Sequence, residues 1–193
     1  MEWPSAPLPS AVPPETSPQV PRSPEPRPPL QRIDQTLLDR LSGEARREAR
    51  LRRHHNLHRL PDKVQRFLNA LQPGTYVRPH RHCRDEPGSG FECFVVLQGA
   101  IGLLVLNRAG EVSRIERLEA NGPLKGIELA EGQFHTLVAL LPDTVMLELK
   151  QGPYEPATDK EFLTRFPAEG TPDAVLQERR WRNLFEPAEA SKG

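Results

Sequence analysis

From Val64 to Lys150 the chain is a succession of short apolar runs separated by turn residues, and this pattern restricts the fold more than any other feature. Runs of this kind are typical of β-strands, and Gly and Pro at the breaks supply the turns. We expect strands at residues 67–71, 75–82, 92–97, 101–106, 112–118, 126–129, 135–141 and 144–150. Helical segments do not alternate with these runs, which argues against a parallel sheet. The sequence predicts an all-β domain, either a barrel or a double-sheet jelly roll.

The sequence on either side of these runs has a different composition. The first 30 residues hold half of the chain's 22 prolines and few aliphatic side chains, so we expect a disordered Pro-rich tail. Apolar residues at helical spacing after Asp34 predict a helix, whose second half is rich in arginine. The chain then divides into a tail (1–30), a basic helix (34–55), the barrel (56–152) and a C-terminal extension (153–193) with a helix at 173–184.

The overall charge gives no reason to expect nucleic acid or an anionic membrane as a partner, since 26 basic residues balance 26 acidic ones. We interpret the arginines of residues 34–55 as a solvated face interleaved with glutamates, with a nucleic-acid or phosphate contact as the alternative. No apolar run approaches the roughly 20 residues that span a bilayer, and no signal-peptide core is present. Cys83 and Cys93 are the two cysteines, and we expect buried, reduced thiols and a cytoplasmic location rather than a disulfide or zinc ligation.

Three histidines and one glutamate are placed to converge on one point inside such a barrel. His80 and His82 are two residues apart and therefore share one face of their strand. Glu92 begins the next apolar strand, and His135 opens another one. This set leaves coordination positions open for water or substrate, which is typical of a catalytic or ligand-binding metal site rather than a closed structural one. We expect one divalent ion, either Fe, Mn or Zn.

Other polar residues lie near these candidate ligands in the sequence. Tyr76 and Arg78 precede His80 at even spacing, so we expect both to share its face. Tyr76 is then a candidate for proton transfer and substrate contact, and Arg78 for holding an anionic group. Glu148 and Lys150 alternate on the last strand and face either the lumen or solvent. Glu148 is the second candidate for a catalytic acid or base.

The spacing of these residues resembles the two motifs of the cupin superfamily. Gly74-(five residues)-His80-X-His82 followed by Glu92-(six residues)-Gly99 is similar to the first motif, and Gly132-X-X-His135 to the second. The gap before Glu92 is longer than in the family. Glu86 keeps the shorter gap but lies in a Pro-Gly-Ser-Gly loop, and Glu92 has the right spacing to Gly99.

At finer grain, most of the chain resembles the WbuC family of cupin-fold metalloproteins. The matching stretches are Asn56-Leu57-His58, residues 64–71, residues 73–82, Gly152-Pro-Tyr154 and Asp159-Lys160. The resemblance implies a cupin-type double-stranded β-helix with a metal ion, an association with bacterial surface-polysaccharide biosynthesis and a homodimer. Asn56 and His58 are candidates through this resemblance alone.

Two functions fit this reading. The favoured one is a small metalloenzyme acting on a sugar-related or other small polar metabolite, as an isomerase or epimerase with a redox-silent ion or as a dioxygenase with iron. The alternative is a non-catalytic, metal-dependent ligand-binding or regulatory module. In either case we expect a small, anionic or sugar-like ligand as partner.

Overall fold

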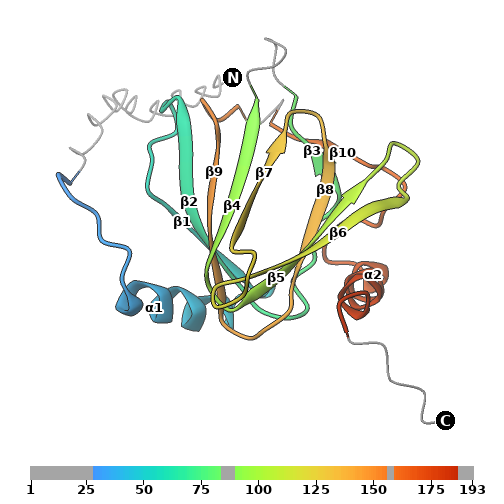
Figure 1. The fold of residues 1–193 in the computed structure, drawn as a ribbon, viewed down its shortest axis with the longest axis horizontal. Coiled ribbons are helices and arrows are strands. Elements are labelled where there is room, and N and C mark those ends of the chain that lie inside the picture. Colours follow the sequence, from blue (N-terminus) through green and yellow to red (C-terminus); the bar gives the residue numbers. More distant parts are fainter. Residues whose placement is uncertain (1–27, 84–89, 156–158, 187–193) are drawn as a thin grey trace, which may run out of the picture. The chain divides into compact units, whose positions relative to one another are not determined.

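The computed structural model describes residues 28–83, 90–155 and 159–186. The following description concerns the unit that begins at Gln31, whose fold is drawn in Figure 1. The tail expected to be disordered, and the alternative ligand Glu86, lie almost wholly outside the described residues. No helix of the described part is long and apolar enough to cross a membrane.

Two antiparallel five-stranded sheets make up the domain. In the first sheet the strands follow the order β1 (Arg52–Asn56), β2 (Val64–Leu71), β9 (Thr144–Gln151), β4 (Phe91–Gln98) and β7 (Gly126–Ala130). In the second sheet the order is β10 (Glu161–Phe162), β3 (His80–Arg81), β8 (Phe134–Ala139), β5 (Ala100–Leu106) and β6 (Val112–Glu119). Strands distant in sequence, such as β2 and β9, are neighbours in space. This confirms the expected all-β fold, a jelly roll of two antiparallel sheets.

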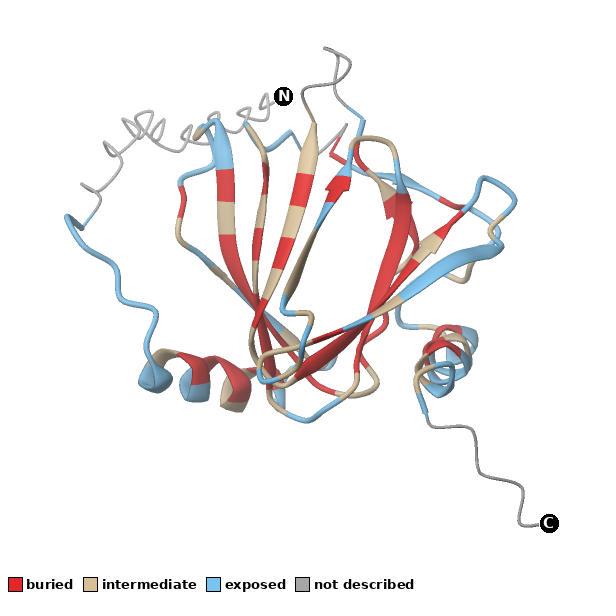
Figure 2. Ribbon diagram, in the orientation of Figure 1, coloured by how far each residue is buried: buried red, intermediate tan, exposed pale blue. Residues whose placement is uncertain are grey.

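An apolar core fills the space between the sheets, and a helix covers the outer side of each. Residues of both sheets, among them Phe94, Ile101 and Met146, form the inner core. Helix α1 (Gln35–Ala45) packs its buried face on outward-pointing residues of β2 and β9. Helix α2 (Pro172–Asn183) packs Ala174 and Trp181 on the outer side of the second sheet. Figure 2 shows these buried faces in red on both helices. The helix expected at residues 173–184 is thus confirmed, with one-residue shifts at its ends.

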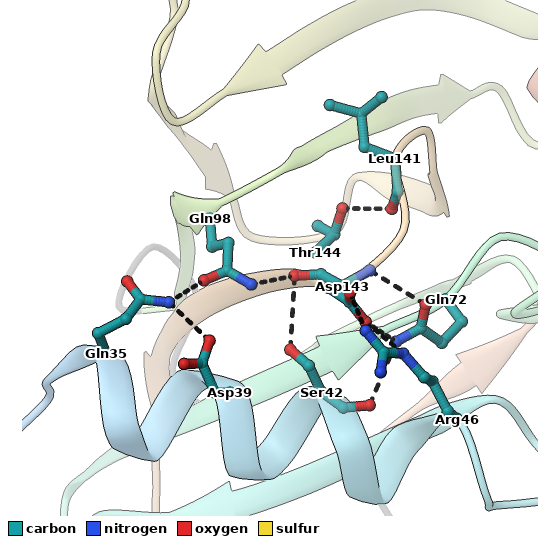
Figure 3. A network of polar contacts seen from close by, with 9 residues as sticks. All are labelled: Gln35, Asp39, Ser42, Arg46, Gln72, Gln98, Leu141, Asp143 and Thr144. Carbon is teal, nitrogen blue, oxygen red and sulfur yellow. Dashed lines mark hydrogen bonds and ion pairs between the residues drawn. The ribbon is translucent and has the colours of Figure 1, made fainter.

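Helix α1 is fixed to the sheet through the turn at Asp143, which precedes β9. The Asp143 carboxylate pairs with the Arg46 guanidinium and accepts from Gln72 Nε2 at 2.8 Å. Its carbonyl accepts from Gln98 Nε2 at 2.7 Å and from Ser42. Figure 3 shows how these side chains converge on the turn. The bond from Arg46 lowers the pKa of Asp143 despite partial burial. These contacts set the position of β9, which carries lumen-facing residues of the site.

The sequence interpretation was wrong at two segments. The helix expected at 34–55 ends at Ala45, and Leu51 takes a positive φ of 54° that redirects the chain. Residues 52–56 then form β1, because β2 offers them a full antiparallel partner. The strand expected at 75–82 is reduced to His80–Arg81, with residues 75–79 outside any ladder.

Four arginines of residues 46–53 form ion pairs: Arg46 with Asp143, Arg50 and Arg52 with Glu169, and Arg53 with Glu44 and Glu48.

Candidate metal centre

The two sheets bring the four predicted ligands together inside the barrel. His80 on β3 lies directly opposite His135 on β8, and His82 follows β3 by one residue. Glu92 lies on β4 of the facing sheet. All four side chains are buried. One nitrogen from each histidine can be chosen so that the three lie within 4.8 Å of one another. These three histidines can therefore bind a metal ion.

Backbone carbonyls set the orientation of all three imidazole rings. His80 Nδ1 donates to the carbonyl of Arg78 at 2.9 Å, and His135 Nδ1 donates to that of Gln133 at 3.0 Å. His82 Nδ1 donates to the carbonyl of Asp159. A carbonyl can only accept, so each Nδ1 carries the proton and a neutral ring keeps its lone pair on Nε2. Burial also lowers the pKa of His80 well below its usual value, which favours the neutral ring. Metal-binding histidines are held in this way.

The Glu92 carboxylate lies beside two of the three histidines. Its oxygens lie 3.0 Å from His135 Nε2 and 3.5 Å from His82 Nε2. Buried Glu92 Oε2 and His82 Nε2 nevertheless make no hydrogen bond to any described residue. Buried polar atoms without partners are costly. Three imidazole nitrogens and one carboxylate that face each other in this way fit a divalent cation.

A cavity of about 600 Å³ opens from His80, Glu92 and His135 into the rest of the barrel lumen. Glu148 on β9 lines it, which decides between the lumen and solvent orientations that the sequence left open. Glu148 is buried and accepts from Asn69 Nδ2 at 2.6 Å. Burial, and then the charge of Glu92, raise the pKa of Glu148 well above its usual value. Glu148 is therefore a buried carboxyl group beside the candidate ligands, in surroundings that favour its protonated form.

Lys150 and Asp159 form a buried ion pair at the same cavity. Lys150 Nζ lies 2.8 Å from Asp159 Oδ2, and both side chains are almost fully buried. Asp159 also supplies the carbonyl that holds His82. Neither Asp159 nor Asn69 was singled out as a site residue from the sequence, although both lie in stretches that resemble the WbuC family. Asn56 and His58 also line the cavity.

The expectation that Tyr76 and Arg78 face the metal ligands is wrong. Alternation requires a continuous strand, and residues 75–79 belong to none. Tyr76 instead stacks on Trp181 in the outer cluster, and its hydroxyl donates to the carbonyl of Pro167 at 2.9 Å. Burial raises the pKa of Tyr76 to about 12. The Arg78 guanidinium lies 5.5 Å from the centre of the Phe162 ring. Neither residue lines the cavity.

The two cysteines are free thiols as expected, but the expectation that both are buried is wrong. Cys83 and Cys93 form no disulfide, and neither belongs to the candidate ligand set. Cys83 is exposed and Cys93 is half-buried. Burial raises the pKa of the Cys93 thiol, so its reactive thiolate form is disfavoured.

Comparison with known proteins gives one partial family match. The model described as a domain of unknown function (DUF6016) matches residues 33–118. This range contains His80, His82 and Glu92 but stops before His135. Comparison with curated proteins finds none that matches.

Solved structures with a similar fold include cupin proteins. The capsular polysaccharide assembling protein CapF from Staphylococcus aureus is 19% identical, with a TM-score of 0.46 over 56% of this chain and 31% of its own. KdgF from Halomonas sp. is 20% identical, with a TM-score of 0.42 over 55% of this chain and 83% of its own. The Cnp3 cupin domain of Schizosaccharomyces pombe is 14% identical, with a TM-score of 0.38 over 51% and 62%. The chain therefore spans less than a third of CapF.

Proposed function

We propose that this chain is a metal-dependent cupin enzyme that acts on a small polar, sugar-like metabolite by proton transfer, as an isomerase or epimerase does. The observation that carries the proposal is the orientation of the three imidazoles, whose Nδ1 atoms are all held by carbonyls so that their Nε2 lone pairs are free. A cavity of about 600 Å³ beside them has the volume of a small-molecule site.

His80, His82, His135 and Glu92 would hold the ion. Nitrogen and oxygen donors without a thiolate suit iron, manganese and zinc alike. A bound divalent ion supplies a Lewis acid that polarises a carbonyl or hydroxyl oxygen of the substrate. His80, Glu92 and His135 line the cavity, so an ion held there would be within reach of a ligand in it.

Glu148 is the group that we assign to proton transfer. It is buried in the cavity wall. Asn69 Nδ2 donates to its Oε2 and fixes the carboxyl plane, so Oε1 is the atom that carries the proton. Burial and the charge of Glu92 raise the pKa of Glu148 well above its usual value, and this favours the protonated form that a general acid needs. Tyr76 has no part in this role, because it lies outside the cavity.

Elemental analysis of the anaerobically purified protein tests the metal site. We expect about one divalent ion per chain in the wild type, and loss of the ion in Glu92→Gln, His82→Ala and His135→Ala. His55→Ala is the matched control, because His55 lies on β1 outside the cavity lining and should leave metal content unchanged. Full metal occupancy in the ligand variants would refute the ligand assignment.

Turnover distinguishes the enzyme from a binding module that uses the same site. The metal-loaded protein is incubated in D₂O with a panel of aldoses, ketoses and sugar acids, and NMR detects deuterium that enters carbon positions. We expect exchange in the wild type and its loss in Glu148→Gln with metal content retained. Oxygen uptake in place of exchange would favour the dioxygenase. Stoichiometric metal with neither activity would favour the binding module.

A further inference from the structure

Positive side chains gather in the lining of the cavity. Arg50 and Arg52 of this lining share one carboxylate, that of Glu169. Lys150 is neutralised by its buried partner Asp159. Lys160 also lines the cavity, and its side chain is exposed. Its ammonium makes no ion pair or hydrogen bond within residues 28–83, 90–155 and 159–186. The carboxyl groups of Glu92 and Glu148 also line the cavity, so the positive charge that is free to attract an anion is the local one of Lys160.

The register of β10 brings Lys160 close to the candidate ligands. Phe162 pairs with His80 and Glu161 with Arg81 in the antiparallel ladder, and Leu163 N donates to the Pro79 carbonyl at 2.9 Å. Lys160 directly precedes Glu161, the first residue of β10. Phe162 and Lys160 both line the cavity. The charge of Lys160 also acts on His80 and Glu148.

Asn69 provides a different recognition group deeper in the cavity. Its side chain lines the wall and is 4% exposed. Nδ2 is used by Glu148, but Oδ1 is buried and accepts no hydrogen bond from any described residue. A buried acceptor without a partner is costly. A ligand hydroxyl group could donate to it and remove this cost, and neutral apolar ligands could not.

We propose that the substrate is a small hydroxylated metabolite that carries an oxyanion, either a carboxylate or a phosphate. This inference rests on the function proposed above and names its substrate class. Lys160 binds the oxyanion at the mouth of the cavity, and Asn69 Oδ1 accepts from a hydroxyl group near Glu148. The anion-binding role that the sequence suggested for Arg78 thus belongs to Lys160, which reaches the cavity from the edge strand.

Titration calorimetry with the full-length, Mn²⁺-loaded protein tests this assignment. The probes are two sugar acids (D-gluconate and D-erythronate), two sugar phosphates (D-glucose 6-phosphate and D-erythrose 4-phosphate) and two neutral compounds (D-glucose and erythritol). We expect at least one anionic probe to bind ~tenfold or more tightly than its neutral counterpart. The class that binds more tightly identifies the oxyanion as carboxylate or phosphate.

Lys160→Gln should abolish this preference and leave metal content unchanged. Lys125→Gln is the control, because this exposed lysine follows β6 and donates to the Ala120 carbonyl, outside the cavity lining. Equal binding of charged and neutral probes, binding of none, or an unchanged preference in Lys160→Gln would overturn the inference. Metal content is measured on the same samples. If the wild type contains metal but binds charged and neutral probes equally, only the substrate class is refuted. If the wild type takes up no metal, the proposed function is refuted as well.

Discussion

Replacing Lys150 with methionine should destabilise the protein strongly at neutral pH. Lys150 Nζ lies 2.8 Å from Asp159 Oδ2, with side chains 5% and 4% exposed. Methionine keeps most of the aliphatic stem, so the substitution mainly removes the charge that neutralises the Asp159 carboxylate. Removing one partner of a buried ion pair costs about 3–5 kcal/mol. For a chain of this length each 1 kcal/mol lowers Tm by about 2–4 °C, so we expect a fall of roughly 6–20 °C.

Urea unfolding and calorimetry of metal-free protein measure this loss without a contribution from bound metal. Lys125→Met on the surface is the matched control and should change the free energy of unfolding by no more than about 0.5 kcal/mol. In the double variant Lys150→Met/Asp159→Asn the buried charge is gone, so at least half of the lost stability should return. A loss below about 1 kcal/mol in the single variant would refute the reasoning, and so would a double variant no more stable than the single one.

Two further predictions concern glycine positions and the displaced tyrosine. Gly99 has φ of +74°, and an added Cβ would lie 2.4 Å from Thr144 Oγ1, so Gly99→Ala should lose about 1–3 kcal/mol in urea unfolding. A Cβ added at Gly43 in α1 would meet nothing within 4 Å, so Gly43→Ala should raise the free energy of unfolding by about 0.5–1 kcal/mol. If the two glycine variants changed the stability in the same direction, this comparison would be contradicted. Tyr154→Phe leaves Tyr76 as the one tyrosine, and its ultraviolet titration should have a midpoint at about 12. A midpoint near the ordinary value of about 10 would show that the phenol is not buried.

The sequence predicted the parts of this protein that depend on local pattern. Alternating or continuous apolar runs located β4, β5 and β9 closely, because burial of one face leaves a periodic signal. The sequence interpretation failed at β1. All five residues of Arg52–Asn56 are polar, and this segment is a strand because it pairs with β2. A strand that forms through such pairing has no periodic signal of its own.

The candidate site shows the same division. The spacing of His80, His82, Glu92 and His135 placed four side chains that the structure does bring together. Tyr76 was misplaced, because the even spacing counted residues that lie outside the two-residue strand β3. The role of Asp159 at His82 was beyond prediction, since its contribution is a main-chain carbonyl that every residue type carries. Neither the pairing of distant segments nor a contact made by a main-chain group can be predicted from which residue stands at a position.

The carbonyls that hold the three rings come from different distances along the chain. His80 and His135 are each oriented by a carbonyl two residues upstream, whereas His82 depends on a carbonyl 77 positions away. Two rings are therefore oriented by local contacts, whereas the third depends on a contact with the distant segment around Asp159. Metal affinity would then measure how completely the chain has folded. A chain that ends after β9 would keep every proposed ligand yet bind metal about 10–100-fold more weakly.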